Sequence, residues 1–292
     1  MRVPFRLVDV FTERPLAGNQ LCVIPEPLDI TAELMLAIAQ EIGFSETTFV
    51  TSADGDRYAM RIFMPAHEIP FAGHPTLGTA FVLASEGRIT SPATQTVAAG
   101  EFRVEVDVGG GTARMRQHAP EFGEPLDARR RADAAQATGL TADDLVPDLP
   151  VQVVSTGLGY LHLPVRTVDA LVRARSDAER LTPILGAAGI DAAYLFTVLE
   201  PDDRGARAKA RCFAPPAGIA EDPATGSAAG PLGAYVVHHG VISSGRLTIS
   251  QGEEIGRPST LEVDVEPDGD TLAVHVSGGV RVVGAGAFDL PD

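Results

Sequence analysis

Four polar side chains of this 292-residue chain stand beside predicted turns or helix starts, where they could reach a binding site: Glu46, His74, Asp222 and Ser227. Glu46 directly precedes a predicted strand at residues 47–51. A carboxyl group in a partly dry site has a raised pKa and can both remove and return a proton near neutral pH. Proton transfer is therefore the chemistry that these residue types suggest. From position alone, a solvated loop glutamate is the alternative.

The other three residues belong to a motif that is written twice, about half a chain apart. The first copy reads Arg-Ile-Phe-Met-Pro over residues 61–65 and Gly-His-Pro-Thr-Leu-Gly-Thr-Ala over 73–80. The second reads Arg-Cys-Phe-Ala-Pro over 211–215 and Glu-Asp-Pro-Ala-Thr-Gly-Ser-Ala over 221–228. Each copy is predicted to run from a strand through a Pro-marked turn into an apolar helix. The repeat suggests two similar lobes, with chance similarity of two Ala/Gly-rich segments as the alternative.

In this repeat His74 matches Asp222, just before the two predicted helices, and Thr79 matches Ser227. A helix N-terminus offers unpaired N–H groups and partial positive charge, so two facing N-termini would suit a small carboxylate. An Asp there is often only a cap, and a hydroxyl inside an apolar helix usually bonds to the preceding turn. A histidine is a poorer cap, which makes His74 the more suggestive residue of the first pair.

Strands are the main elements that must position these residues. Period-two alternation, turn signals and short apolar runs predict mostly antiparallel strands at 102–108, 151–155, 194–199, 247–250, 261–265 and 272–276. Helices are predicted at 31–42, 76–86, 129–138, 167–179 and 226–238. Those at 76–86 and 226–238 are nearly uncharged, so each is expected at the centre of a lobe, wrapped by its sheet. The predicted fold class is α+β.

Length and composition limit the remaining choices. A chain this long fits two lobes better than one core, and the Pro/Gly-rich link at 119–125 is the best boundary. We predict an N-terminal lobe of residues 1–118 plus about 280–292, and a C-terminal lobe of 119–279. A net charge of −16 argues against nucleic acid and anionic membranes as partners.

Other sequence signals are mostly negative. No stretch approaches the roughly 20 apolar residues of a membrane span, and the N-terminus lacks the features of a signal peptide. A cytoplasmic protein is expected. Cys22 and Cys212 are predicted to be buried free thiols, and no His/Cys cluster has metal-binding spacing.

Five segments together resemble the PhzF-like phenazine-biosynthesis isomerases of the diaminopimelate epimerase superfamily: 8–12, 18–19, 45–47, 71–76 and 221–227. They read Val-Asp-Val-Phe-Thr, Gly-Asn, Ser-Glu-Thr, Phe-Ala-Gly-His-Pro-Thr and Glu-Asp-Pro-Ala-Thr-Gly-Ser. The resemblance runs nearly end to end. It implies two pseudo-symmetric lobes, each a curled, mostly antiparallel sheet around one helix, with the active site in the cleft between them. It also implies a homodimer that needs no cofactor and no metal.

The same resemblance assigns roles to residues. Glu46 matches the general acid/base, and His74, Asp222 and Ser227 match other polar site residues. Backbone amides around Gly73, Gly226 and Ser227 match a carboxylate cradle. The usual Gly-Asn-Pro reads Gly18-Asn19-Gln20, with Asn19 expected at the cleft lip. The superfamily's paired catalytic cysteines are missing, so two-thiol racemisation is not expected.

The sequence thus predicts a cofactor-independent isomerase that moves a proton between carbons of a small cyclic amino or hydroxy carboxylic acid. Glu46 would be the general acid/base, with His74 and Asp222 as further catalytic residues and Asn19, Gly73, Gly226 and Ser227 binding the substrate. One alternative is a one-base epimerase, racemase or dehydratase on the same fold. Another is a small-acid-binding protein that has lost its chemistry.

Overall fold

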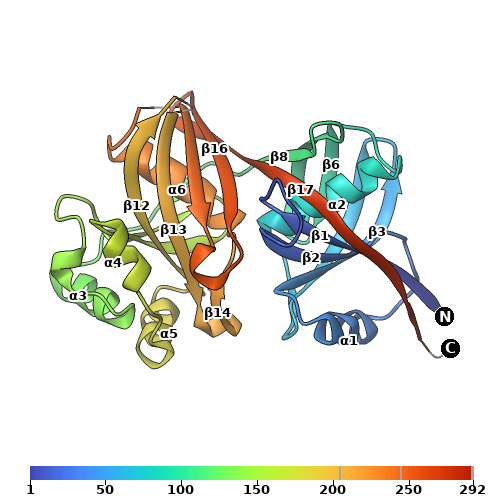
Figure 1. Ribbon diagram of the computed structural model, residues 1–292, viewed down its shortest axis with the longest axis horizontal. Helices are drawn as coiled ribbons and strands as arrows, with labels where there is room; N and C mark the ends of the chain where they lie inside the picture. Colours follow the sequence, from blue (N-terminus) through green and yellow to red (C-terminus); the bar gives the residue numbers. More distant parts are fainter. Residues whose placement is uncertain (204, 244, 291–292) are drawn as a thin grey trace. The chain divides into compact units, whose positions relative to one another are not determined.

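The computed structural model describes residues 1–203, 205–243 and 245–290 (Figure 1). Internal contacts divide the chain into two compact units. Unit 1 is Met1–Arg116 with the C-terminal segment from Ser277, and unit 2 is Gln117–Val276. The boundaries predicted from the sequence lie after residue 118 and near residue 280.

Unit 1 is a mixed sheet around one buried helix. Its strands are β1 (Arg2–Val10), β2 (Asn19–Ile24), β3 (Glu46–Asp54), β4 (Arg57–Phe63), β5 (Glu68–Ile69), β6 (Ala93–Val97), β7 (Gly100–Asp107) and β8 (Thr112–Arg116). Its helices are α1 (Ala32–Ile42) and α2 (Gly73–Ser85). Eleven of the 13 residues of α2 are buried, and the helix packs against β1, β2, β3, β7 and β8.

Most strand pairs of unit 1 are antiparallel, whereas β2–β3 and β4–β6 are parallel. The long strand β17 (Thr271–Asp289) begins in unit 2 and ends in unit 1. There it pairs antiparallel with β1, from Arg2↔Asp289 to Val10↔Val280. The strand predicted at 102–108 is confirmed as β7, which pairs antiparallel with β8.

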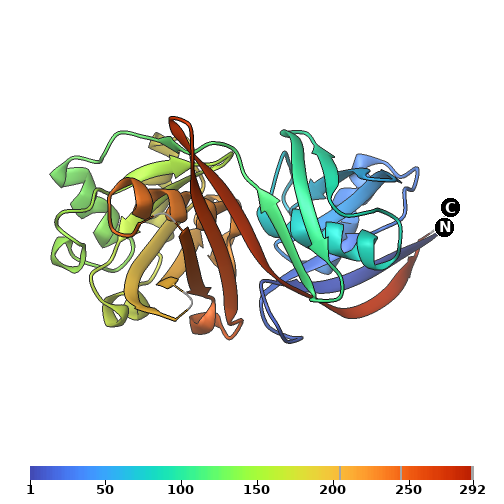
Figure 2. The same cartoon turned by 90° about the horizontal axis from the view of Figure 1, so that it is seen from above.

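Unit 2 repeats this construction and adds helices. Its strands are β9 (Glu121–Phe122), β10 (Gln152–Ser155), β11 (Gly159–Pro164), β12 (Ala193–Asp202), β13 (Gly205–Ala214), β14 (Ile219–Asp222), β15 (Gly245–Gln251), β16 (Ser259–Asp268) and the first part of β17. Its helices are α3 (Ala128–Ala137), α4 (Val168–Arg173), α5 (Ala178–Ala187) and α6 (Gly226–His238). Residues 226–236 of α6 are all buried. Figures 1 and 2 show α2 and α6 each lying among the strands of its own unit.

Local signals account for several helix ends. The Thr31 hydroxyl accepts a hydrogen bond from the Leu34 N–H at the start of α1, and Gly43 ends the helix in the left-handed conformation, with φ 68°. The predicted helix at 226–238 is confirmed. Helix α2 begins at Gly73, three residues before the predicted start, because Pro75 fits the first turn of a helix, where its missing N–H has no intrahelical partner.

The prediction of a single helix at 167–179 is wrong, because the structure has two helices there, α4 and α5. Ala174 is extended, with ψ 143°, and Asp177 accepts a hydrogen bond from Arg180 N–H to begin α5. The end of α4 is fixed from elsewhere in the chain. The buried guanidinium of Arg211 donates to three carbonyl oxygens there, those of Leu171, Val172 and Ala174. Such a partner leaves no trace in the local pattern.

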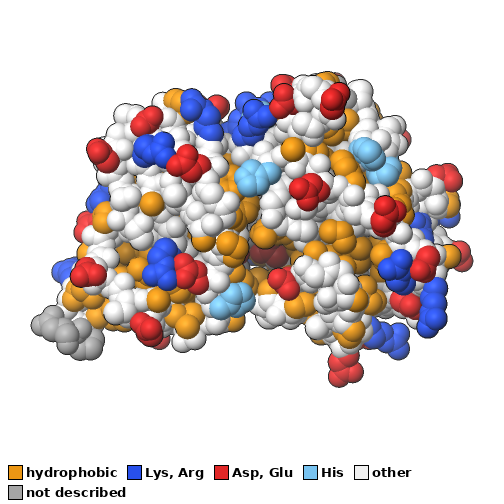
Figure 3. Space-filling model, turned by 180° about the vertical axis from the view of Figure 1, so that it is seen from behind, with side chains coloured by type: hydrophobic (Ala, Val, Ile, Leu, Met, Phe, Trp, Pro, Cys, Tyr) orange, Lys and Arg blue, Asp and Glu red, His pale blue; other side chains and the backbone are white. Residues whose placement is uncertain are grey.

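Both cysteines are buried free thiols, as predicted. Burial raises the pKa of Cys22 to about 12 and also raises the pKa of Cys212. Acidic and basic side chains are interspersed on the face seen in Figure 3. No helix among the described residues is long and apolar enough to cross a membrane.

Candidate active-site residues

Glu46 and His74 lie together in unit 1. Glu46 is the first residue of β3, and His74 is the second residue of α2. The distance between Glu46 Oε2 and His74 Nε2 is 3.5 Å, and their side chains are 13% and 5% exposed. The Ser45 hydroxyl contacts Asn19 Oδ1 at 3.4 Å, which places the start of β2 next to the same group. Unit 1 therefore brings Asn19, Glu46, Gly73 and His74 into one neighbourhood.

The carboxyl group of Glu46 is in an environment that disfavours its charge. Burial raises its pKa from 4.5 to about 7, and a hydrogen bond with Ser45 offsets part of this effect. Within the described residues, Glu46 Oε2 makes no hydrogen bond, and its one ion-pair contact is with His74 Nε2 at 3.5 Å. A carboxyl group with this pKa is present in both protonation states near pH 7, as a group that takes and returns a proton must be.

The structure corrects how the two copies of the motif correspond. The helices begin at Gly73 and Gly226, so His74 corresponds to Ser227. His74, which was predicted just before its helix, is instead the second residue of α2, whereas Asp222 ends β14 and lies before α6 as predicted. Thr79 is not in the first turn of α2. It is fully buried, and its hydroxyl bonds to that of Thr48 at 2.8 Å.

In unit 2, Asp222 is held by a buried hydrogen-bond network. The Thr225 hydroxyl donates to Asp222 Oδ2 at 2.5 Å. The amide of Gln251, a residue with no exposed surface, donates to the Asp222 carbonyl at 2.8 Å and to Thr225 Oγ1 at 3.0 Å. Its oxygen accepts from Tyr194 Oη and Thr225 N. Both the oxygen and the nitrogen of the Gln251 amide thus bond to the turn between β14 and α6 and hold it in place.

The start of α6 has two further buried partners. Gln117 Nε2 donates to the Gly226 carbonyl at 2.9 Å, and Gln117 Oε1 accepts from the Thr156 hydroxyl at 2.6 Å. A Cβ at Gly230 would lie 1.8 Å from Gln117 Oε1, so the glycine makes room for this side chain. The Tyr160 hydroxyl lies 2.6 Å from Ser227 Oγ.

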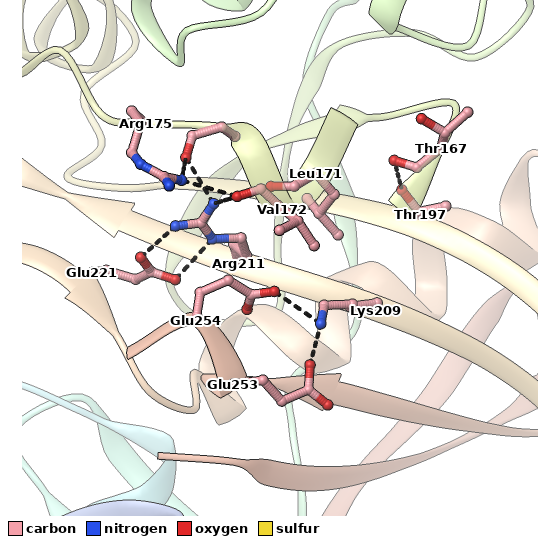
Figure 4. A network of polar contacts seen from close by, with 11 residues as sticks. Thr167, Leu171, Val172, Arg175, Thr197, Lys209, Arg211, Glu221, Glu253 and Glu254 are labelled. Carbon is pink, nitrogen blue, oxygen red and sulfur yellow. Dashed lines mark hydrogen bonds and ion pairs between the residues drawn. The ribbon is translucent and has the colours of Figure 1, made fainter. Parts of the chain in front are cut away.

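An arginine–glutamate pair holds the strand that leads to Asp222 (Figure 4). Arg211 Nε and Nη2 bond to the two carboxylate oxygens of Glu221 at 2.9 and 2.6 Å. The guanidinium also lies over the Phe213 ring, 4.9 Å from its centroid. Unit 1 repeats the arrangement. Arg61 Nε and Nη2 bond to the two carboxylate oxygens of Glu68 at 2.8 and 2.6 Å, and the guanidinium lies 5.1 Å from the centroid of the Phe63 ring. The repeated Arg and Phe are therefore structural in both copies.

Comparison with known proteins places the chain in a family. The family model described as phenazine biosynthesis-like protein, PhzC-PhzF, matches residues 8–286. The chain belongs to this family. It is 33% identical over 284 residues to the uncharacterized isomerase YddE of Escherichia coli O157:H7, covering 94% of this chain and 95% of the relative.

Two further PhzF-family comparisons agree. The chain is 32% identical over 290 residues to the trans-2,3-dihydro-3-hydroxyanthranilate isomerase of Pseudomonas fluorescens. The match covers 97% of this chain and 98% of the relative. The chain also matches the crystal structure of a PhzF-family phenazine biosynthesis protein from Bacillus anthracis with a TM-score of 0.88. The two sequences are 28% identical, and the match covers 99% of this chain and 100% of the other. These findings confirm the predicted family and α+β fold class. The protein is an isomerase.

Three residues of this PhzF-family chain that support its candidate site were missed by sequence reasoning: Gln117, Tyr160 and Gln251. Their contacts to the second motif copy span 109, 67 and 29 residues along the chain. None of them stands in a motif, so no local signal could have found them. In the part of the chain that the structure describes, no group of three His, Cys, Asp or Glu side chains is placed to hold a metal ion.

His162 is expected to make this PhzF-family protein sensitive to acid. It is fully buried, and burial lowers its pKa from 6.5 to about 4. A histidine with a lowered folded-state pKa leaves stability complete above pH 6.5, and stability falls as the pH drops toward 4, because the unfolded chain takes up the proton first. From these two pKa values, about 2 kcal/mol should be lost between pH 7 and 5.

Urea unfolding of the unmodified protein and of His162→Phe at pH 7 and 5 measures this loss. The variant lacks the titrating group, so its stability should fall by about 2 kcal/mol less over the same pH interval. Comparing the change with pH cancels any constant cost of the substitution. Equal changes in the two proteins would show that His162 is not responsible.

Proposed function

We propose that this isomerase moves a proton between carbons of a small cyclic amino or hydroxy carboxylic acid, without a cofactor, and that Glu46 is its general acid/base. The buried Glu46 carboxyl group, with a pKa of about 7 and His74 at 3.5 Å, is the observation that carries the proposal. The name of the Pseudomonas fluorescens relative, a dihydro-hydroxyanthranilate isomerase, supports the substrate class.

In the proposed reaction, the Glu46 carboxylate removes a proton from an activated C–H bond of the substrate. The electron pair of that bond shifts through the adjacent double bond, and protonated Glu46 returns the proton to a second carbon on the same face. No electron leaves the substrate, so the reaction needs no redox partner. His74 would orient the Glu46 carboxyl group, and Asp222 would be the further catalytic residue.

We further propose that the amides of Gly73 and Gly226, the Asn19 side chain and the Ser227 hydroxyl bind the polar substituents of the substrate. Asn19 and Ser227 are 1% and 6% exposed, so any bond that they make to a ligand is shielded from bulk water. Hydrogen bonds of this kind to a charged group contribute about 1.5–3 kcal/mol each. Orientation of the substrate by these groups would add to the effect of the base.

Proton NMR in D₂O tests the function with a panel of cyclic amino acids and trans-2,3-dihydro-3-hydroxyanthranilate. A migrated double bond, with deuterium entering one carbon, should appear with the unmodified protein and not with Glu46→Gln. Deuterium confined to the α carbon would instead identify an epimerase or racemase. Turnover of any panel member by Glu46→Gln at the unmodified rate would remove Glu46 from the role.

The pH dependence of kcat/KM provides a second test. Glu46 must be ionised to accept a proton, so kcat/KM should rise about tenfold per pH unit below pH 7 and level off above it. The raised pKa sets this midpoint, well above the 4.5 of an ordinary glutamate. A rate that stays flat from pH 5 to 8 would exclude a base with this pKa.

A homodimer in the cytoplasm is also part of the proposal, supported by the family resemblance. The chain mass is 30.6 kDa, so light scattering coupled to size-exclusion chromatography should give about twice that mass. A mass equal to one chain at micromolar concentration would contradict the dimer.

A further inference from the structure

Tyr160 makes a contact that couples it to Ser227. The two hydroxyl oxygens are 2.6 Å apart, and the residues are only 8% and 6% exposed. Tyr160 belongs to β11, and Ser227 is the second residue of α6. In the part of the chain that the structure describes, the Ser227 hydroxyl has this one side-chain partner.

The chemistry of the pair favours one direction for the shared hydrogen. Each hydroxyl has one hydrogen to donate and lone pairs to accept. A phenol, with a pKa of about 10, is the more acidic group and hence the better donor, so Tyr160 is expected to donate to Ser227 Oγ. The Ser227 hydrogen is then directed away from Tyr160. It is available to a hydrogen-bond acceptor, such as a carboxylate oxygen.

The position of Tyr160 is fixed by its surroundings. His162 Nδ1 lies 2.9 Å from the Tyr160 carbonyl, and because a carbonyl oxygen only accepts, Nδ1 holds the hydrogen. The His162 ring itself lies between aromatic rings. It is stacked on Tyr235, with ring centroids 5.9 Å apart, and edge-on to Tyr194, with ring centroids 5.7 Å apart. The β10–β11 ladder also pairs Val154 with Tyr160. These contacts hold the Tyr160 backbone, and the 2.6 Å contact of the two hydroxyl groups places the phenol against Ser227 Oγ.

We propose that Tyr160 is a positioning residue for substrate binding: it donates to Ser227 Oγ and so directs the Ser227 hydroxyl hydrogen to the substrate carboxylate. This inference rests on the proposed function, in which Ser227 binds a carboxylic acid. An ionised carboxylate only accepts hydrogen bonds, so it distinguishes a directed donor from a hydroxyl that is free to rotate. Tyr160 acts through Ser227 and contacts no reacting atom.

Binding of anthranilate, measured by isothermal titration calorimetry, tests the proposal without turnover. Anthranilate is a ring carboxylate that has no sp³ ring carbon, and hence no activated C–H proton to migrate; aniline is its match without the carboxylate. Ser227→Ala should weaken anthranilate binding about 10–100-fold, the effect of a lost hydrogen bond to a charged group. Tyr160→Phe should weaken it about 3–10-fold, because Ser227 keeps its hydroxyl but loses its direction. Aniline binding should change in neither variant.

The double variant separates positioning from a general structural effect. If Tyr160 acts through Ser227, Tyr160→Phe should have no further effect on anthranilate binding in a Ser227→Ala background. Tyr235→Phe is the matched control, because its buried hydroxyl bonds to the Pro150 carbonyl at 2.7 Å and has no contact with Ser227. Its affinity for anthranilate should equal that of the unmodified protein.

Three results would overturn the inference: additive losses in the double variant, unchanged binding by Tyr160→Phe, or no saturable binding of anthranilate to the unmodified protein. Failure of the proposed isomerisation is distinguishable, since it would appear as missing deuterium exchange while the binding pattern of the four variants persists.

Discussion

Replacement of Glu46 with glutamine is expected to lower kcat by a factor of about 10²–10⁴. The amide has the shape of the carboxyl group but cannot accept the substrate proton. Because His74 keeps its position 3.5 Å away, substrate binding should change little, and the loss should fall on kcat more than on KM. Steady-state rates with the substrate found by NMR measure this split. A loss confined to KM would assign Glu46 to binding.

The same substitution should make the protein more stable in alkaline solution. The folded-state pKa of Glu46, about 7, is above its unfolded value of 4.5, so the ionised form is disfavoured by the fold. Stability is therefore lost as the pH rises from 4.5 through 7, by at most about 3 kcal/mol. That figure is an upper bound because the side chain is 13% exposed.

Urea unfolding at pH 4 and pH 8 tests the effect on stability. Glu46→Gln should match the unmodified protein at pH 4 and exceed it at pH 8, because only the unmodified chain must bury a charge there. The exposed residue Glu41 offers the control, and Glu41→Gln should show no such difference. A Glu46→Gln variant that is less stable at pH 8 would contradict a disfavoured carboxylate. A Glu46→Gln variant that loses activity but gains stability would show that the Glu46 carboxyl group serves the function of the protein at a cost to its stability.

Much of this arrangement could be read from the chain, because it is set by local rules. Thr31 and Gly43 bound α1 through a capping hydroxyl and a left-handed glycine, both visible as residue types. The apolar run of α6 predicted a buried helix with the correct ends. Each motif copy also placed its polar residues near the start of its helix: His74 is the second residue of α2, and Asp222 ends the strand before α6.

The rest depends on contacts that join distant segments. The split between α4 and α5 follows from Arg211, about 40 residues away from the carbonyls that it contacts, and its pattern in the sequence is that of one helix. His74 was predicted just before its helix, and not inside it, because residue types were aligned without knowledge of where α2 begins. Tyr160 and Gln251 were missed because strand alternation gives burial but not the partner of a buried hydroxyl or amide.

The second large effect is expected at Arg211. Arg211→Met should destabilise the protein by about 3–5 kcal/mol, because it leaves the Glu221 carboxylate, only 10% exposed, without its partner. Three carbonyl oxygens at the end of α4 lose their donor as well. Urea unfolding at pH 7 measures the change. The double variant Arg211→Met/Glu221→Gln should recover part of the loss, since it removes the unpaired charge.

The repeat supplies the matched control for this experiment. Arg61 has the same bidentate contact with Glu68 and the same position over a phenylalanine ring, but its side chain is 34% exposed where that of Arg211 is 3% exposed. Arg61→Met should therefore cost less than about 1 kcal/mol, as exposed ion pairs do. Equal losses at the two positions would show that burial is not what makes the Arg211 pair important. A difference of several kcal/mol would show that one sequence motif has been put to two uses: a surface pair in unit 1, and in unit 2 a buried anchor that ties α4 to the strand ending at Asp222.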